Sequence, residues 1–462
     1  MRLKLVLLLF IISSAEAQQK YWIQHSDCIE IKVHFEGLTP DYSSAWIAAC
    51  SYSLSATQAR TLNNLGITLS PVKTFSYLRN ERPPKNGFGI DQIYGVLLRA
   101  RGLKGKGVKI GVIDGGFANI LDDPSLNHLS ENGQIKAYRD YFSNSTDPGT
   151  GRDTHGTEVT QLIAGYNNKT NILHGLATDA TFYLAKTDFD GFERRIEEDN
   201  LIAAMEWMHQ EGVQIINISL GYTKGYNDKS ENYSPEQMDG KTSAVVRAVE
   251  HASVEEGMLI VVAAGNEANN IGWKTLSTLA DAQHALTVGS TQLPVWDKAY
   301  FSSIGPEFID YIKPDVVVFS GVGTSFSAPI ITGLAACIKE YDPGLTNLEI
   351  ISIIQKAGHL YPFPNNYLGY GVPLCENILK ILDRKESNIK RPEIVRSNGN
   401  QIKLNITVET NRLILLHKNA DQFVIKRNVL KPRKSNIRIK RYQGASQTTM
   451  IYDQSAKEII WE

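Results

Sequence analysis

The chain has 462 residues, of which 42% are hydrophobic and 21% are charged, so it can bury more than one core and has the composition of a soluble globular protein. Its formal net charge of -1 hides a basic C-terminal part, where 17 Lys and Arg stand against 7 Asp and Glu from Arg384 onward. These charges alternate with apolar residues, which is typical of a solvated strand face. Because no nucleic-acid-binding motif accompanies them, we expect no nucleic acid partner.

The N-terminal residues have the pattern of a secretory signal peptide. Arg2 and Lys4 precede the apolar run Leu5–Ile12, and a small-x-small site ends at Ala17. This run is too short for a membrane helix, and no other segment reaches about 18 apolar residues. We therefore predict cleavage after Ala17 (signal peptide 1–17), export to the periplasm, cell surface or medium, and no membrane span in the mature chain.

Four cysteines are too few for a disulfide scaffold: Cys28, Cys50, Cys337 and Cys375. Cys337 lies in an apolar run with helical spacing, which favours a buried small hydrophobe. A bridge between Cys337 and Cys375 stays open as the alternative.

Residues 18–86 are expected to form a small α+β domain. A strand covers Ser44–Leu54, a helix begins after Ser55 as its N-cap, and a second strand covers Val72–Leu78. The charged, Pro-rich and aperiodic residues 79–87 indicate an exposed linker.

Residues 87–385 alternate buried strands with helices, which predicts an α/β domain with a parallel sheet and helices on both faces. The expected strands are 108–114, 180–186, 213–220, 258–265 and 285–291. The expected helices are 155–163, 199–210, 243–256, the run after Ser325, and 347–356. Beyond Asp383 short alternating runs predict a β-rich domain at 386–462.

Four polar residues of the α/β domain stand where strands end or helices begin. Asp114 ends a strand, His155 opens a helix, Asn266 follows a strand, and Ser325 lies in GTSFSAP ahead of an apolar run whose first turn holds Pro329. Taken singly, each is more commonly a turn or cap residue. Together they supply the acid, base, oxyanion donor and nucleophile that acyl transfer by serine requires, and strand exits of a parallel sheet share one edge.

The motifs around these residues resemble those of the subtilisin-like serine proteases. The resembling segments are GVKIGVIDGG for the aspartate, DTHGTEVTQLIAG for the histidine, GTSFSAPIITG for the serine, INISLGY for the substrate-binding strand and VVAAGNE for the oxyanion asparagine. The resemblance covers about residues 90–380 and implies a subtilisin-like fold, a triad of Asp114, His155 and Ser325, and Asn266 as oxyanion donor. Two departures are the Gly-Gly pair after Asp114, where Asp-Thr/Ser-Gly is commoner, and Glu158, where many members have a second His.

The same resemblance implies that an extended protein or peptide substrate pairs with the backbone at Ser219, Leu220 and Gly221, and that Ala264 and Gly265 line the primary pocket. Because these two stretches contain small residues and no acid, we expect a roomy pocket for a neutral or apolar side chain. The resemblance implies chemistry without a cofactor. A structural calcium ion is compatible with it, but the sequence identifies no ligands for one.

The resemblance thus implies a secreted serine endopeptidase made as a zymogen, with the domain at 18–86 as its intramolecular inhibitor. One alternative is a catalytically inactive binding protein of the same fold, which the presence of all four functional side chains disfavours. The other is a lipase or esterase of the α/β-hydrolase class, which requires Gly-x-Ser-x-Gly and the order Ser…Asp…His. The sequence has neither feature.

Overall fold

The structure is a computed structural model that divides into two compact units, Met1–Asn80 and Glu81–Glu462. It describes residues 19–24, 31, 35, 38–40, 42–44, 49–67, 69–71, 85–86, 88–143, 145–149, 151–188, 196–224, 232–406, 408–409, 412–432 and 435–462. The predicted signal peptide, the predicted strand at 72–78 and most of the predicted linker lie outside the described residues.

The first unit contains an antiparallel sheet with the strand order β2-β3-β1-β4. Its strands are β1 (Gln19–Gln24), β2 (Tyr42–Ser44), β3 (Ala49–Leu54) and β4 (Ser70–Pro71). Helix α2 (Ala56–Asn64) begins at the predicted cap, because the Ser55 hydroxyl accepts from Gln58 N and the Gln58 side chain accepts from Ser55 N. Tyr52, Leu54 and Leu62 are fully buried in this unit's own core.

The second unit is built on the predicted parallel sheet, whose strand order is β14-β13-β12-β11-β6-β10-β7, with β15 also paired to β13. Only β14 runs antiparallel to its neighbour. The strands are β6 (Lys109–Asp114), β7 (Ile135–Asp140), β10 (Thr181–Lys186), β11 (Ile215–Ile218), β12 (Leu259–Ala263), β13 (Leu286–Gln292), β14 (Asp297–Lys298) and β15 (Val316–Phe319). The edge strand β7 and the short strands β14 and β15 were not among the strands expected from the sequence.

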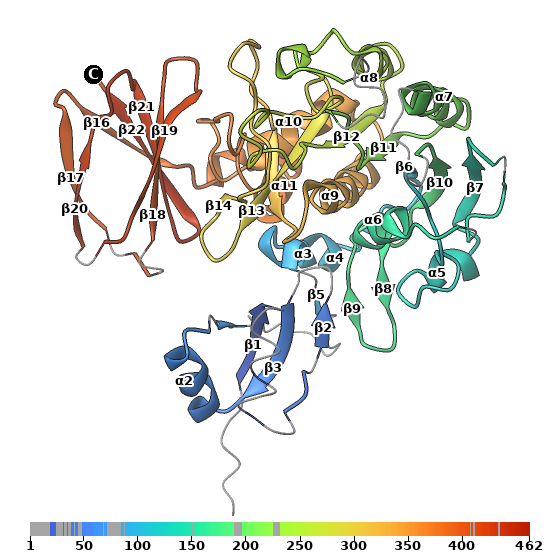
Figure 1. Ribbon diagram of the computed structural model, residues 1–462, viewed down its shortest axis with the longest axis horizontal. Coiled ribbons are helices and arrows are strands. Elements are labelled where there is room, and N and C mark those ends of the chain that lie inside the picture. The colour runs from blue at the N-terminus through green and yellow to red at the C-terminus, as the bar shows by residue number, and fades with distance from the viewer. Residues whose placement is uncertain are drawn as a thin grey trace, which may run out of the picture. The chain divides into compact units, whose positions relative to one another are not determined.

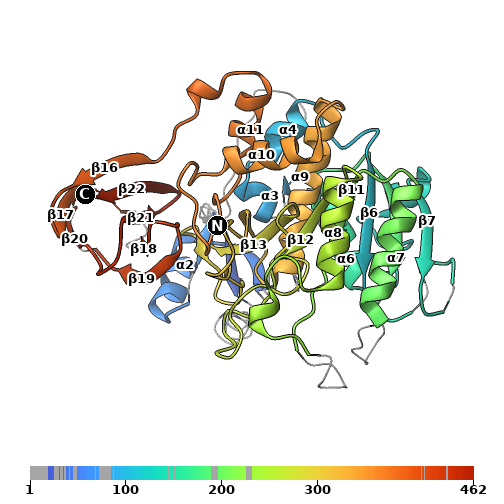
Figure 2. The ribbon, with the colours of Figure 1, turned by 90° about the horizontal axis from the view of Figure 1, so that it is seen from above.

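Helices cover both faces of this sheet, as predicted. In Figure 1 the strands from β12 to β7 cross the middle of the unit, with α6 and α9 below them and α7 and α8 above; Figure 2 gives the view from above. These helices are α6 (His155–Ala164), α7 (Ile196–Gln210), α8 (Ala244–Val254) and α9 (Ala328–Tyr341). Alternate strand residues therefore enter two different cores: Val261 packs on the α9 side and Val262 on the α8 side.

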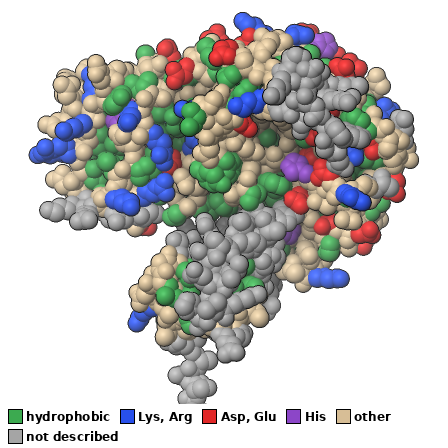
Figure 3. Space-filling view, in the orientation of Figure 1, with side chains coloured by type: hydrophobic (Ala, Val, Ile, Leu, Met, Phe, Trp, Pro, Cys, Tyr) green, Lys and Arg blue, Asp and Glu red, His purple; other side chains and the backbone are tan. Residues whose placement is uncertain are grey.

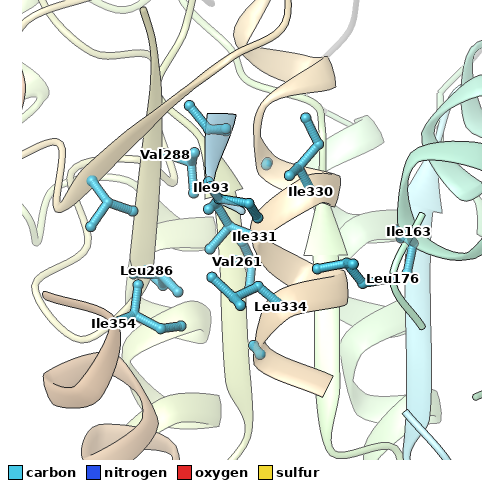
Figure 4. Close-up of a cluster of buried hydrophobic side chains, with 14 of the residues drawn as sticks. Ile93, Ile163, Leu176, Val261, Leu286, Val288, Ile330, Ile331, Leu334 and Ile354 are labelled. Atoms are coloured by element: carbon cyan, nitrogen blue, oxygen red, sulfur yellow. The ribbon is translucent and has the colours of Figure 1, made fainter. Parts of the chain in front are cut away.

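Helix α9 lies in the centre of the larger core. Figure 4 shows Ile330, Ile331 and Leu334 of this helix packed against Val261 and Leu286 of the sheet. Every residue from Ala328 to Ile338 is buried. The sequence pattern predicted one apolar face, but this helix is enclosed on all sides.

Further elements surround this framework. Further α-helices of this unit are α3 (Phe88–Gln92), α4 (Val96–Ala100), α5 (Asn127–Glu131), α10 (Asn347–Ala357) and α11 (Cys375–Leu382). A small three-stranded sheet joins β5 (Lys85–Asn86), β8 (Tyr166–Asn167) and β9 (Ile172–Leu173). Within the described residues there is no helix both long and apolar enough to cross a membrane.

The C-terminal residues form a five-stranded sheet, β16-β22-β21-β18-β19, and a two-stranded sheet, β17-β20. Their strands are β16 (Glu393–Ser397), β17 (Gln401–Asn405), β18 (Leu413–Lys418), β19 (Val424–Leu430), β20 (Asn436–Lys440), β21 (Gln447–Tyr452) and β22 (Ser455–Trp461). Leu413 and Leu415 face a core between the two sheets, whereas Ile414 and Leu416 enter the α9 core.

Polar contacts join the C-terminal sheet to the central sheet as well. The buried carboxylate of Asp297 accepts hydrogen bonds from Arg412 and Arg427, and the Asn366 side chain accepts from Val424 N at 2.9 Å. The β-rich region is therefore part of the second compact unit, which differs from the separate domain expected from its composition.

Cys337 and Cys375 are free thiols. Cys50, Cys337 and Cys375 are all buried, and no disulfide joins Cys337 to Cys375. Burial raises the pKa of both of these latter thiols. Cys337 is thus the buried small hydrophobe that its sequence context indicated.

Candidate active site

The candidate site begins where β6 ends and α6 begins. Asp114 is the last residue of β6 and is fully buried, and His155 is the first residue of α6. His155 Nδ1 lies 2.6 Å from Asp114 Oδ1, which also accepts from Gly115 N at 2.8 Å. The other carboxylate oxygen, Oδ2, is buried and has no hydrogen-bond partner among the described residues. The contact fixes the ring so that Nε2 is the nitrogen left for proton transfer.

Negative charge surrounds the imidazole and makes it a stronger base. The Asp114 charge raises the pKa of His155 to about 9, and Asp153 and Glu158 act in the same direction. Burial of the ring opposes this rise. These carboxylates therefore stabilise the imidazolium that His155 becomes when it takes up a proton.

Ser325 lies in a 3₁₀ turn, Thr324–Phe326, that leads into α9. Its hydroxyl donates to the Ser219 carbonyl at 3.0 Å, and the Ser219 hydroxyl donates to the Ser325 carbonyl at 2.8 Å. No hydrogen bond between Ser325 and His155 occurs among the described contacts. Pro329 is in the first turn of α9 as predicted, but the helix begins at Ala328, so Ser325 precedes it by one turn and does not act as its cap.

Asn266 follows β12 and is held by the turn that contains Ser325. Its Oδ1 accepts from Thr324 N at 2.9 Å and from the Thr324 hydroxyl at 3.2 Å. Because the oxygen is engaged in these two bonds, the Nδ2 hydrogens are the ones available to a ligand.

A cleft of about 410 Å³ brings the predicted residues together. It is lined by Asp114, His155, Ser325, Asn266, Ser219, Leu220, Gly221 and Gly265. Ala264 was also expected to line a substrate pocket, but it is fully buried in the core beneath α8. Its neighbour Ala263 lines the cleft instead, because successive strand residues point to opposite faces of a sheet.

Two glycines shape one end of the cleft. A Cβ on Gly221 would lie 2.3 Å from Ser277 Oγ, and a Cβ on Gly265, whose φ is +101°, would lie 2.9 Å from the same atom. These positions accept only glycine if the Ser277 hydroxyl keeps its place.

A family model described as the subtilase family matches residues 105–371, which are more than half of the chain. This chain belongs to the subtilase family of serine proteases. The subtilase match includes all four candidate residues and excludes the first unit and the C-terminal strands.

Two individual subtilases are similar to this chain in sequence, and one solved structure shares its fold. Subtilisin E of Bacillus subtilis (strain 168) is 28% identical over 295 residues, which are 62% of this chain and 69% of that protein. Subtilisin BL of Lederbergia lenta is 30% identical over 274 residues, 57% of this chain and 87% of that protein. The CspB protease of Clostridium perfringens has the same fold, with a TM-score of 0.52 and 16% identity over 66% of this chain and 100% of its own.

Four further residues of this subtilase cleft were not among the expected site residues. Asp153, Asp188, Glu267 and Ser277 also line it. Asp153 is the first residue of the histidine motif and Glu267 is the last residue of the asparagine motif, so their spacing to His155 and Asn266 could have identified them. Asp188 and Ser277 have no local signal, because only the fold brings them to this edge of the sheet. Within the described chain, no group of three or more His, Cys, Asp or Glu side chains is placed to hold a metal ion.

Proposed function

We propose that this subtilase is a secreted serine endopeptidase that hydrolyses peptide bonds through an acyl-enzyme on Ser325. The observation that carries the proposal is the 2.6 Å contact between His155 and Asp114 in the cleft that also contains Ser325 and Asn266. These side chains can serve as the base, its orienting acid, the nucleophile and an oxyanion donor, which are the groups that acyl transfer by serine requires.

The reaction follows from these groups. On substrate binding, the Ser325 hydroxyl turns from the Ser219 carbonyl towards His155 Nε2, which takes its proton as Oγ bonds to the scissile carbonyl carbon. The Asn266 amide and the Ser325 N–H donate to the resulting oxyanion, and Asp114 stabilises the imidazolium. His155 then gives the proton to the leaving amine as the C–N bond breaks. Water, deprotonated by His155, cleaves the ester and restores Ser325.

The substrate is a protein or peptide held in an extended conformation. Leu220 and Gly221 follow β11, and neither makes a backbone hydrogen bond to another described residue. Their backbone groups are therefore available to a substrate strand, as β-augmentation requires. We propose that the chemistry needs no cofactor, since the side chains of the cleft supply the nucleophile, base and oxyanion donors.

Labelling with a fluorophosphonate probe tests the proposal. The processed wild-type protein should be labelled at Ser325, as located by mass spectrometry of its peptides. A Ser327→Ala variant removes a neighbouring hydroxyl, buried and bonded to the Val318 carbonyl, and should still be labelled. Absence of labelling in folded, processed wild-type protein would favour the catalytically inactive binding protein instead.

We further propose that the protein is exported and made as a zymogen whose first unit inhibits the enzyme until it is removed. The basis is the order of the chain: an apolar leader, a small folded unit with its own core, and a polar Pro-containing segment before the enzyme. Self-cleavage is expected between Leu78 and Gly89. N-terminal sequencing of wild-type and Ser325→Ala proteins, each expressed without other proteases, should show the cut only in the wild type.

A further inference from the structure

A second cavity, of about 730 Å³, lies at the opposite edge of the central sheet from the cleft. Its lining includes Asp315, which stands directly before β15, and His284, which stands two residues before β13. The cleft is lined instead by residues that follow β11 and β12, and these strands run parallel to β13 and β15. The length of the strands therefore separates the two sites, and the cavity takes no part in the proposed acyl transfer.

Three segments distant in sequence form the walls of this cavity. Helix α10 contributes Leu348, Ile351 and Gln355, whose spacing places them on one face of the helix. Residues 307–312 form a second wall, and the turn between β18 and β19 adds Asp421. The volume lies within the range of about 300–1,000 Å³ that is typical of ligand sites.

Large apolar side chains at this cavity are open to solvent. Phe308 is 55% exposed and Leu348 is 44% exposed, whereas Ile309, Ile351 and Phe423 are buried and line the interior. Single exposed apolar side chains are common on protein surfaces, but here two of them adjoin one partly apolar cavity. A ligand with an apolar group covers them and gains free energy from their burial.

The exposed part of the lining is acidic. Glu307, Asp310 and Asp421 are exposed, and none of their carboxylates forms an ion pair or hydrogen bond with another described residue. Their combined negative potential attracts cations and repels nucleic acids and other polyanions.

Two further charged or titratable residues of the lining have partners inside the protein. Lys313 Nζ lies 2.7 Å from Asp315 Oδ2, and His284 Nδ1 lies 2.5 Å from the Glu250 carboxylate. Among the described residues that line the cavity there is no Lys or Arg. The three exposed acids therefore set the charge that a ligand meets.

We propose that this cavity binds a segment of a partner protein in which Lys or Arg stands next to an aromatic or aliphatic residue. The apolar residue packs on Phe308 and Leu348, and the cationic side chain forms charge-assisted hydrogen bonds with the exposed acids. The cavity is larger than a single side chain, so it accommodates several residues of a peptide. Because the site lies away from the cleft, the inference does not depend on the proposed peptidase function.

Selection from a library of random short peptides tests the cavity. Full-length Ser325→Ala protein, in which the proposed nucleophile is removed, is immobilised, and peptides displayed on phage are selected on it at low salt. Enriched sequences should combine Lys or Arg with an aromatic or aliphatic residue. The Kd of the most enriched peptide is then measured by fluorescence anisotropy and should rise with salt. The absence of enrichment over an uncoated surface, or enrichment of acidic or uncharged sequences, would overturn the proposal.

Substitutions in the Ser325→Ala background locate the binding. The triple change Glu307→Gln, Asp310→Asn and Asp421→Asn should raise the Kd about tenfold or more, because three exposed charge pairs are lost. Leu348→Ala should also raise it, because an apolar contact is lost. These side chains are exposed, so the variants should stay folded, as thermal unfolding can verify. An unchanged Kd in both variants would show that the peptide binds elsewhere.

A second triple change, at exposed acids outside the cavity, is the matched control. Asp122→Asn, Glu131→Gln and Glu255→Gln alter the net charge by the same amount, and none of these residues lines the cavity. This control should bind the peptide with an unchanged Kd. An equal loss of affinity in the two triple variants would mean that the peptide responds only to overall charge, which contradicts the proposal.

A second copy of this chain is the alternative occupant, because its own C-terminal part is basic. Analytical ultracentrifugation of the Ser325→Ala protein distinguishes the two occupants. Self-association that the triple change at the cavity abolishes would assign the site to another copy and refute a separate partner. A protein that stays monomeric and binds the selected peptide supports the proposal.

Discussion

The imidazole of His155 is the titratable group on which activity should depend most directly. It is hydrogen-bonded to a fully buried carboxylate and has Asp153 and Glu158 as further acidic neighbours. All three charges favour the protonated ring and raise its pKa, with Asp114 making the largest contribution. The neutral form, which acts as general base, is therefore populated only at more alkaline pH.

We expect kcat/KM to increase with pH along a limb whose midpoint lies above the ordinary histidine value, towards the pKa of about 9 of His155. A short, uncharged peptide should be used so that only the enzyme titrates. Glu158→Gln should move the midpoint to lower pH, because one charge that stabilises the imidazolium is removed. A midpoint at or below about 6.5 would be inconsistent with this environment.

Asn266→Ala should lower kcat with little change in KM. Removal of an oxyanion donor affects the transition state more than the bound substrate, and the expected loss is about 10²–10³-fold, the range known for the oxyanion asparagine of subtilisin. Asn270→Ala, which removes a nearby amide bonded to Glu267, serves as control and should keep near-normal kcat. A rise in KM with unchanged kcat would show that Asn266 binds the ground state instead.

Among the elements, α9 has the greatest influence on the position of the nucleophile. It follows directly from the turn that contains Ser325, and its apolar side chains contact the sheet and α6. Because the helix is buried on all sides, it has little freedom to shift. The turn before α9 is therefore held near the ends of β11 and β12. Ser219 follows β11, and Asn266 follows β12.

Leu334→Ala should destabilise the protein by about 2–5 kcal/mol, since Leu334 is fully buried and the helix cannot move to fill the cavity. Denaturant unfolding of the Ser325→Ala background measures the change without self-digestion. Leu348→Ala on α10, where the side chain is 44% exposed, is the matched control and should change stability by about 0.5 kcal/mol or less. Equal effects of the two changes would mean that α9 is not the centre of the core.

The whole second unit includes the C-terminal strands, which bring a different charge to the molecule. Figure 3 shows Lys and Arg side chains over these strands at the left, whereas Asp and Glu side chains are frequent at the right, over the far end of the central sheet. Opposite charges also meet at the junction, where Arg412 and Arg427 bind the buried Asp297. The basic region thus has a structural role in addition to its solvated face.

Truncation after Asp383 should lower the Tm markedly, because it exposes the surface that Ile414, Leu416 and Val424 cover and leaves Asp297 without its arginines. Among the described residues, none beyond Ser325 lines the cleft, so peptide hydrolysis should persist at temperatures where the truncated protein remains folded. Thermal unfolding and peptide assays at low temperature check both parts. An unchanged Tm would indicate that the C-terminal strands form an independent domain.

The sequence by itself determined the parallel α/β sheet, the order of its principal elements, the Ser55 helix cap, and eight of the nine expected cleft residues. These features are encoded locally: apolar runs define the buried strands, and polar residues at strand ends must meet at the carboxyl edge of a parallel sheet. The positions of Asp114, His155, Asn266 and Ser325 within their motifs therefore predict that the four side chains gather in one place, and all four line the same cleft.

The tertiary structure alone decided what depends on neighbours distant in sequence. Successive residues of the β12 segment point to opposite faces of the sheet, so Ala264 is buried in the core on the α8 side. Helix α9, predicted to have one apolar face, is buried in the centre of the core because other elements pack around it. Asp188 lies in the cleft because β10 pairs with β6. Strand β18 has no solvent-exposed face because its second face packs against the α9 core. In each case burial is decided by the element that packs opposite, and a local pattern of residues contains no information about that partner.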